Sequence, residues 1–299
     1  MADDTLPSVQ YESAASSSGI QRFLNPALDL DDARARLRAG EMVVLRNAFV
    51  SEFAEATHAA LSDPSFPWTQ NEAYFDDGYS FCHSNVYDRS RWPHALNATF
   101  SVFSDEATKQ WMEELSGREC AGVPIGSPSN YRPGDYSLPH SDWMGQRTVA
   151  YVWHLSKDWR PEWGGGLYWA QNRHNQRIYP ASFNTLVLFL VTPSSSHFVT
   201  PVSRHAAGQR LAFNGWWQSD YLPRRLDGEA RLAQMLATRE ARSAITAAQA
   251  AAIGDLLDSG GGGGGGDCSA EIARLCDDLE DEIIDACGPE VLLRKLVHR

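Results

Sequence analysis

A histidine and an aspartate stand two residues apart in the segment YRPGDYSLPHSDW, residues 131–143, as His140 and Asp142. In an extended backbone, side chains two residues apart point to the same face, so this imidazole and this carboxylate could bind one cation. A His-x-Asp triplet alone is weak, because such triplets also arise by chance on protein surfaces. It predicts a metal site only if a third ligand comes from elsewhere in the chain.

Two further residues, which lie much later in the chain, complete a candidate site. His197 opens the apolar run HFVTPV, and Arg210 opens the run RLAFNGWW. Two histidines and one carboxylate on one face of Fe(II) leave three adjacent positions open for a bidentate co-substrate and dioxygen. A buried arginine offers a planar fork that matches the distal carboxylate of 2-oxoglutarate, whereas the plain alternative for Arg210 is a surface strand residue. We predict an iron site with a co-substrate anchor.

The elements that must position these residues follow from the pattern of apolar residues. Five short β-type runs lie within about 75 residues and are separated by turn residues, which predicts a sandwich or jelly roll. They are RTVAYVWHL (147–155), GLYWA (166–170), NTLVLFLV (184–191), HFVTPV (197–202) and RLAFNGWW (210–217). Upstream, the patterns predict helices over 31–40, 51–62 (with Ser51 as N-cap) and 105–115, and a strand over 42–49.

The remaining segments divide the chain into a domain and its appendages. We predict a disordered leader over 1–19, one catalytic domain over 20–225 with its β-core at about 128–220, and a helical extension over 226–259. Seven consecutive glycines at 260–266 form a linker, and residues 267–299 form an amphipathic helix. The C-terminal helices are expected either to dock back on the domain or to contact a partner or a second copy of the chain.

Composition narrows the classes of partner. The chain of 299 residues has a formal net charge of -12 and no long run of Lys and Arg, which argues against nucleic acid. No stretch approaches 18 apolar residues, and the N-terminus is acidic and polar, so neither a membrane span nor a signal peptide is expected. The five cysteines lack CxxC spacing, which favours a reducing compartment and a soluble, cytoplasmic protein.

Several motifs in a fixed order give the chain a family resemblance. They are Tyr131 with Gly134 and Tyr136, then His140 and Asp142, RTVAYVWHLSKDW, GGGLYW, PxxFNTLVLF, HFVTPV and RLAFNGWW. Residues from about 131 to 217 thereby resemble the catalytic core of the prolyl 4-hydroxylase-like branch of the Fe(II)/2-oxoglutarate oxygenases. The resemblance implies a mainly β fold with flanking helices, whose core is a double-stranded β-helix of the jelly-roll, cupin-like kind.

The resemblance also implies roles for individual residues. His140, Asp142 and His197 would bind Fe(II), and Arg210 and Tyr131 would bind 2-oxoglutarate. His154 stands where related enzymes often have a tyrosine near the co-substrate, so it is either a hydrogen-bonding or a packing residue. The interval from His197 to Arg210 is longer than is usual, and its turn over 203–208 holds His205, the alternative third ligand. We prefer His197 because it opens a strand. Candidates for the substrate pocket are Trp143, Tyr136, His83, Trp153 and Trp169.

The implied reaction is hydroxylation of an unactivated C–H bond with dioxygen, releasing succinate and carbon dioxide, with ascorbate as a reductant. The resemblance favours a peptidyl or protein substrate, with proline the first expectation. Two alternatives stay open. The chain could tailor a free amino acid or natural-product precursor by hydroxylation, desaturation or cyclisation, or it could be a non-catalytic, cupin-like metal-binding or scaffold protein.

Overall fold

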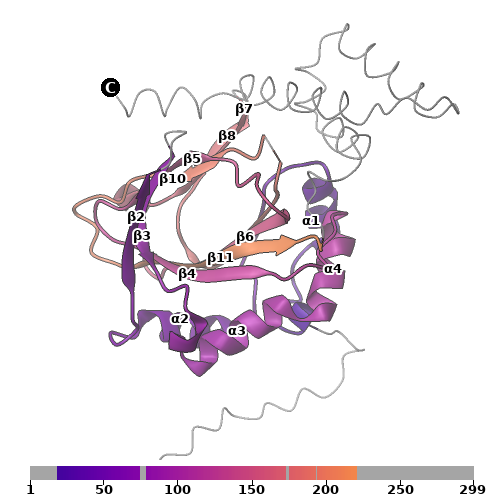
Figure 1. Ribbon diagram of the computed structural model, residues 1–299, viewed down its shortest axis with the longest axis horizontal. Coiled ribbons are helices and arrows are strands. Elements are labelled where there is room, and N and C mark those ends of the chain that lie inside the picture. Colours follow the sequence, from indigo (N-terminus) through magenta and orange to yellow (C-terminus); the bar gives the residue numbers. More distant parts are fainter. Residues whose placement is uncertain (1–18, 75–78, 173–174, 193, 221–299) are drawn as a thin grey trace, which may run out of the picture.

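The computed structural model of the chain describes residues 19–74, 79–172, 175–192 and 194–220 (Figure 1). The predicted leader up to residue 18 lies outside these residues. So do the helical extension, the glycine linker and the C-terminal helix predicted beyond residue 220.

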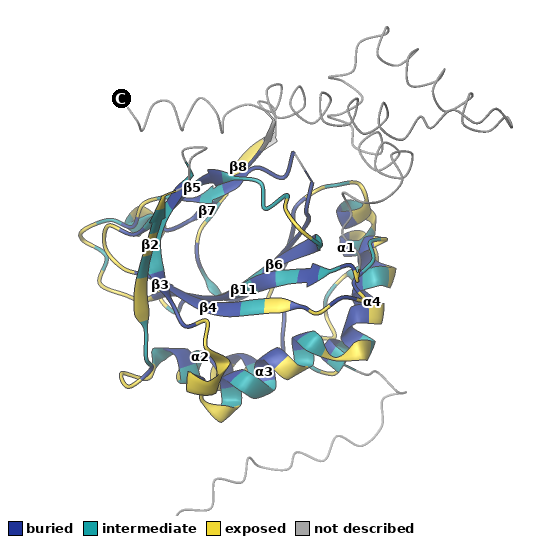
Figure 2. Ribbon diagram, in the orientation of Figure 1, coloured by how far each residue is buried: buried dark blue, intermediate teal, exposed yellow. Residues whose placement is uncertain are grey.

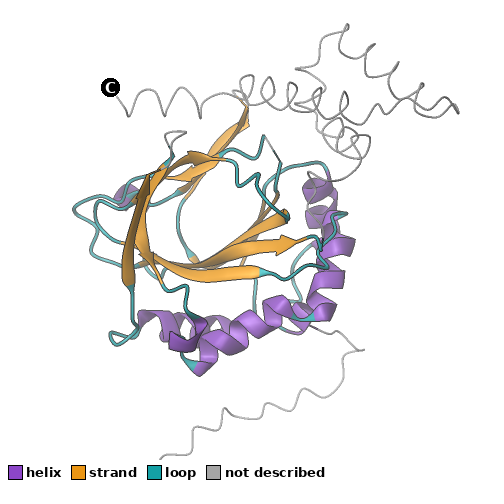
Figure 3. Cartoon of the chain, viewed as in Figure 1, coloured by secondary structure: helices purple, strands orange, loops and turns teal. Residues whose placement is uncertain are grey.

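Eleven antiparallel strands of the described part form one curled sheet (Figure 3). Along the sheet their order is β1-β9-β6-β11-β4-β3-β5-β10-β7-β8, and β2 pairs with β3 off this path. Their bounds are β1 Val43–Arg46, β2 Thr69–Tyr74, β3 Ser80–Asn85, β4 Ile125–Tyr131, β5 Tyr136–His140, β6 Arg147–Leu155, β7 Leu167–Asn172, β8 Asn175–Tyr179, β9 Phe183–Leu190, β10 His197–Val199 and β11 Arg210–Gln218. This arrangement confirms the predicted jelly-roll core.

Helices of the described part cover one outer side of the sheet, beside β4, β6 and β11 (Figure 1). None of them is long and apolar enough to cross a membrane. The α-helices are α1 Leu30–Arg38, α2 Ser51–Ser62, α3 His94–Ser104 and α4 Glu106–Ser116, and three short 3-10 helices are Gly19–Arg22, Arg89–Arg91 and Pro161–Trp163.

The largest apolar core lies between these helices and the sheet. Phe103 of α3 packs against Trp153 of β6 and Trp217 of β11 with ring centroids 6.1 and 5.9 Å apart. Because side chains alternate along a strand, β6 sends Val149, Tyr151, Trp153 and Leu155 into this core, whereas the residues between them, including His154, face the inner side. The outer face of the sheet therefore holds the largest apolar core, and β6 and β11, which separate it from the inner face, are largely buried along their length (Figure 2).

The five predicted β-runs all correspond to strands, β6 with the predicted bounds and the other four with bounds that differ at one or both ends, and the three predicted helices are present. The sequence patterns did not predict α3, β2, β3, β4, β5 or β8. The assignment of Ser51 as an N-cap was wrong: Val50 is the cap residue and provides no side-chain cap hydrogen bond. The Val50 N–H donates to the Phe23 carbonyl, so the chain is already fixed one residue before the helix begins.

Candidate metal and co-substrate site

His140 reaches the inner face of the sheet through a bulge in β5. Strand β10 pairs with β5 at His197↔His140 and at Val199↔Ser137, so two steps on β10 face three on β5. An extra residue in one strand reverses which face the following side chain points to, and bulges of this kind are common beside active sites. Ser137 pairs with Phe81 of β3, and the bulge lets both Ser137 and His140 face inward.

Asp142 follows two residues after the strand has ended and has a left-handed backbone, with φ of 52°. The prediction of an extended His-x-Asp pair was therefore wrong in its backbone geometry, although the two side chains do meet. Aspartate is among the residues that adopt this conformation most readily. Two neighbours fix the carboxylate: Arg147 Nη1 donates to its Oδ1 at 3.3 Å, and Trp216 Nε1 donates to its Oδ2 at 3.0 Å. The Arg147 guanidinium also lies 3.6 Å from the Trp216 ring centroid.

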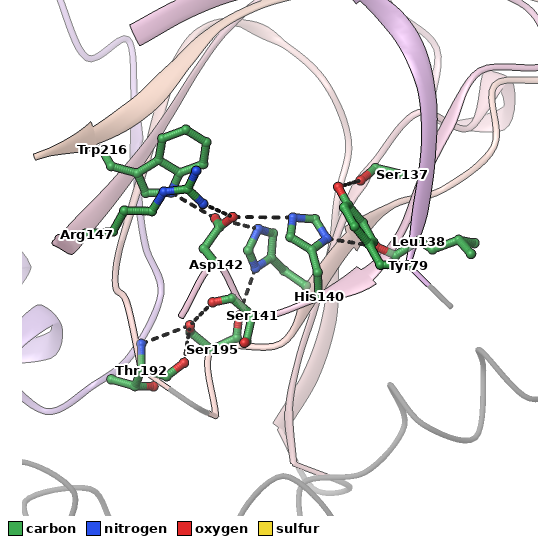
Figure 4. Close-up of polar contacts among 11 residues, drawn as sticks. Tyr79, Ser137, Leu138, His140, Ser141, Asp142, Arg147, Thr192, Ser195 and Trp216 are labelled. Atoms are coloured by element: carbon green, nitrogen blue, oxygen red, sulfur yellow. Dashed lines mark hydrogen bonds and ion pairs between the residues drawn. The ribbon is translucent and has the colours of Figure 1, made fainter. Parts of the chain in front are cut away.

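His197 is positioned by the serine-rich turn that precedes β10. The Ser195 hydroxyl donates to the carbonyl of Ser141 at 3.1 Å, which ties this turn to the residue between His140 and Asp142 (Figure 4). The same hydroxyl accepts from the Thr192 N–H at 3.1 Å. The two ligand-bearing segments are thus bonded to each other independently of any metal.

The three predicted ligands converge on one point. One ligand atom from each of His140, Asp142 and His197 lies within 4.8 Å of the others. The Nε2 atoms of the two histidines are 3.6 and 3.3 Å from the carboxylate oxygens of Asp142 (Figure 4). Each Nδ1 lies close to a backbone carbonyl, that of Leu138 at 2.7 Å and that of Ser195 at 2.8 Å. When Nδ1–H donates to this carbonyl, Nε2 carries a lone pair that can bind a cation. Metal-binding histidines generally have such a hydrogen-bond partner on the other ring nitrogen.

The electrostatics of this group favour a carboxylate at Asp142. Burial alone would raise its pKa, but His197, then His140 and Arg147, lower the pKa below that of an ordinary aspartate. The donor set is two imidazole nitrogens and a carboxylate on one side of the cluster, which fits a facially coordinated Fe(II) with open positions. His205 takes no part in it: its side chain is exposed in the turn before β11, so it is not a third ligand here.

Arg210 is a fully buried cation on the inner face of β11. It is 2% exposed, its Nε donates to the carbonyl of Gly165 at 2.9 Å, and its guanidinium carbon lies 4.4 Å from the ring centroid of Tyr131. Its Nη2 is enclosed and has no hydrogen-bond partner among the described residues. An enclosed guanidinium without an anionic partner is costly, and it matches the carboxylate of a bound co-substrate. The surface alternative for Arg210 does not hold.

Two further residues lie beside the Arg210 anchor. His154 is 0% exposed on the inner face of β6, and neither ring nitrogen has a partner among the described residues. Burial, then the charge of Arg210, lowers the pKa of His154 well below its ordinary value, so the ring is neutral. Burial raises the pKa of Tyr131 to about 12 against the opposing charge of Arg210, which keeps a phenol that can donate.

The predicted pocket residues separate into two groups. His83 stacks on Tyr131, Trp169 lies 6.4 Å from the His197 ring, and Trp143 packs against the same inner cluster as Trp169. Tyr136 and Trp153 do not face the site. Trp153 points to the helix-side core because of strand alternation, and Tyr136 pairs with Cys82 on the face of β3 opposite to His83, where its hydroxyl meets that of Ser80.

Three residues at the site were not predicted. Arg147 and Trp216 hold Asp142, and the Tyr79 ring lies 4.7 Å from the ring of His140 (Figure 4). Arg147 and Trp216 both lie in the predicted strands 147–155 and 210–217, which pair with each other, and that pairing is the signal that could have found them. Tyr79 gave no such signal, because the strand that it precedes was not predicted.

The motifs that build this site match a known family. The sequence profile of the 2OG-Fe(II) oxygenase superfamily matches residues 126–218, the stretch from β4 to β11 that holds all three candidate ligands and Arg210. Residues 126–218 form a 2OG-Fe(II) oxygenase core.

Curated relatives of this oxygenase core are prolyl 3-hydroxylases. The chain is 28% identical over 179 residues to prolyl 3-hydroxylase OGFOD1 of Mus musculus, covering 58% of this chain and 31% of that protein. It is 30% identical over 158 residues to prolyl 3-hydroxylase sudestada1 of Drosophila melanogaster, covering 48% and 28%. The chain therefore spans about a third of the length of the curated relatives that it matches.

Solved structures share the fold of the oxygenase core. A Pseudomonas putida prolyl-4-hydroxylase superposes with a TM-score of 0.51 at 17% identity, covering 64% of this chain and 98% of that one. A prolyl hydroxylase from Trichoplax adhaerens, in complex with a peptide fragment of hypoxia inducible factor, gives a TM-score of 0.50 at 15% identity, covering 64% and 89%. At these identities the likeness confirms the β-helix fold.

Proposed function

We propose that this chain is an Fe(II)- and 2-oxoglutarate-dependent dioxygenase that hydroxylates a prolyl residue of a peptide or protein. His140, Asp142 and His197 would hold the iron, and Arg210 with Tyr131 would hold the co-substrate. Iron, 2-oxoglutarate and dioxygen together supply the oxidation: one oxygen atom enters the C–H bond as C–OH, the other enters succinate, and carbon dioxide leaves.

The protein's own residues supply placement. The carbonyls of Leu138 and Ser195 orient the two imidazoles, and Arg147 and Trp216 hold both oxygens of Asp142, so that the ligands need no rearrangement when a cation binds. A cofactor enzyme contributes binding, orientation and exclusion of side reactions rather than the redox chemistry itself.

The observation that carries the proposal is the enclosed Arg210, which lies on the same inner face as the three side chains of His140, Asp142 and His197, called the metal group below. Its Nη2 has no partner in the described part of the chain. A metal group alone would fit many metalloproteins, but a metal group combined with a buried cation for a carboxylate fits a 2-oxo acid that chelates the metal at one end and binds the cation at the other.

The choice of substrate rests on the relatives. Both curated proteins named above are prolyl 3-hydroxylases, and the Trichoplax structure contains a peptide. These are properties of those proteins, and they make a peptidyl proline the first substrate to test here. The ring carbon that is oxidised, C3 or C4, is decided by how the peptide lies against the inner face.

The test uses the full chain with Fe(II), 2-oxoglutarate, ascorbate and a set of proline-containing peptides, read by mass spectrometry for the gain of one oxygen atom. Amino-acid analysis of the product then separates 3-hydroxyproline from 4-hydroxyproline. We expect an oxidised peptide from the wild type, none from Arg210→Met, and wild-type yield from Arg204→Met, whose arginine is exposed in the turn before β11. Oxidation of free amino acids without any oxidised peptide would contradict the proposed substrate.

A further inference from the structure

Strand β3 and the residue before it carry a row of rings that runs from the metal group to the arginine anchor. Tyr79, Phe81 and His83 alternate along the chain and so share one face. Ring centroids are 4.7 Å apart for His140 and Tyr79, 6.0 Å for Tyr79 and Phe81, and 4.9 Å for Phe81 and His83. His83 then stacks on Tyr131 at 4.4 Å with an angle of 4° between the planes.

His83 stands at the anchor end of this row. Strands β3 and β4 pair at Ser84↔Asn130 and Asn85↔Ser129. Extended by one residue, this register places His83 opposite Tyr131. Tyr131 in turn pairs with Arg210 on β11. His83, Tyr131 and Arg210 thus occupy one level on three adjacent strands, away from the level at which His140 and His197 pair.

The imidazole of His83 has hydrogen-bonding capacity that the described residues do not use. Its Nδ1 is enclosed and has no partner among them. Burial, then the charges of Arg210 and His140, lowers the pKa of His83 to about 3. The ring is therefore neutral at physiological pH, with one N–H donor and one acceptor. A buried polar atom without a partner is costly, which suggests that it is satisfied when a ligand occupies the site.

We propose that His83 is a further co-substrate-binding residue, whose imidazole N–H donates to the distal carboxylate of 2-oxoglutarate beside Arg210. This rests on the proposed function. Since Nε of Arg210 is taken by the Gly165 carbonyl, the guanidinium and the Tyr131 hydroxyl leave part of the carboxylate for a further donor. A neutral donor fits this place, because a second cation would repel Arg210. His83 would then favour 2-oxo acids with a carboxylate at the far end over those without one.

The variants separate the hydrogen bond from the ring stack. His83→Phe keeps a flat ring against Tyr131 and removes both nitrogens, whereas His83→Gln keeps an N–H donor. His205→Phe makes the same chemical change at an exposed histidine and is the control. Binding of 2-oxoglutarate to Zn(II)-loaded protein, measured by calorimetry, needs no turnover, and KM values for 2-oxoglutarate and peptide are measured on the iron-loaded enzyme.

We expect His83→Phe to weaken 2-oxoglutarate binding by about 10- to 100-fold, as for loss of a hydrogen bond to a charged group. Its KM for peptide should stay at the wild-type value, and its binding of pyruvate, which lacks the distal carboxylate, should not change. His83→Gln should weaken 2-oxoglutarate binding less than His83→Phe, and His205→Phe should leave it unchanged. Equal binding of 2-oxoglutarate by wild type and His83→Phe, or a raised KM for peptide alone, would overturn the proposal.

Should His83→Phe fail to fold, nuclear magnetic resonance of the ¹⁵N-histidine-labelled wild type decides instead. The His83 signal, assigned with His83→Gln, should shift with 2-oxoglutarate and stay in place with pyruvate. A signal that does not shift, although 2-oxoglutarate binds, contradicts the role of His83. Absence of any 2-oxoglutarate binding by the wild type would instead refute the proposed function itself, so the two failures are distinguishable.

Discussion

Each imidazole of the metal group is held by a carbonyl two residues earlier in the chain, Leu138 for His140 and Ser195 for His197. This repeated local contact fixes the tautomer before a metal arrives. Asp142 has no such local partner and is held across the sheet by Arg147 and Trp216. Local sequence therefore orients the histidines, and tertiary pairing of β6 with β11 orients the carboxylate.

Burial of His154 predicts a pH-dependent stability. A histidine in the unfolded chain has a pKa of about 6.5, whereas burial lowers the pKa of folded His154 well below that value. Below about pH 6.5 the unfolded state therefore takes up a proton that the folded state does not. As the pH falls below about 6.5, this residue should therefore lower the free energy of unfolding by up to about 1.4 kcal/mol per pH unit.

Urea unfolding of the metal-free protein between pH 7 and pH 5 measures this dependence. We expect a steeper loss of stability for the wild type than for His154→Phe, because the variant has no proton to take up there. His205→Phe should keep the wild-type slope, since its side chain is exposed in the folded protein. Parallel slopes for the wild type and His154→Phe would refute the argument.

The residues that converge in the candidate metal site could be predicted from the sequence, but their backbone geometry could not. His140, Asp142 and His197 have residue types and spacing that indicate a metal, and the structure brings their ligand atoms together. The bulge in β5 and the left-handed Asp142 leave no mark in a pattern of apolar residues. Tyr136 and Trp153 were misassigned because a one-residue shift reverses the face of a strand.

At the scale of elements, the turn at Gly164 and Gly165 holds the arginine anchor. The carbonyl of Gly165 accepts from Arg210 Nε, and Gly164, with φ of 69°, approaches the next segment so closely that a Cβ would lie 2.2 Å from the carbonyl oxygen of Pro201. Such an approach and such a φ suit glycine alone. The turn therefore joins β7 to the segment after β10 at the level of the anchor.

Substitution of Gly164 should lower the free energy of unfolding by more than the strain of its positive φ alone would. Gly134 also has a positive φ, of 93°, but a Cβ there would meet nothing within 4 Å. We expect Gly134→Ala to lower the free energy of unfolding by about 1–3 kcal/mol through backbone strain, and Gly164→Ala to lower it further by displacing the Pro201 carbonyl. Denaturant titration of both variants measures the difference, and equal losses would contradict a role for the close approach.

Two of the strands that the sequence did not reveal, β2 and β3, share a physical cause. β2 (TQNEAY) and β3 (SFCHSN) are mostly polar, because one face of β3 lines the site and polar contacts with Gln70 and Asp135 lie on the other. Alternation of apolar and polar residues is the signal for a half-buried strand, and it is absent here. The apolar runs β6, β9 and β11 were predicted because both of their faces are buried.

At the scale of the whole molecule, structure and site use opposite faces of one sheet. Phe103, Trp153 and Trp217 lie on the side covered by helices, and the metal group and Arg210 lie on the inner side. The N-terminal helices thus stabilise the sheet without entering the site. The spacing of the short apolar runs predicted a β-core within one domain, whereas the packing of the helices around it depends on contacts between distant segments that no local pattern encodes.

The central claim is that His140, Asp142 and His197 hold an iron that consumes 2-oxoglutarate, and succinate formation tests it most directly. The chain is loaded with Fe(II) without oxygen and then given 2-oxoglutarate and dioxygen. We predict succinate from the wild type and from His205→Ala. We also predict a loss in Asp142→Ala and His197→Ala that exceeds the roughly 10- to 100-fold effect typical of outer-shell partners. Wild-type succinate formation by Asp142→Ala or His197→Ala would contradict the claim.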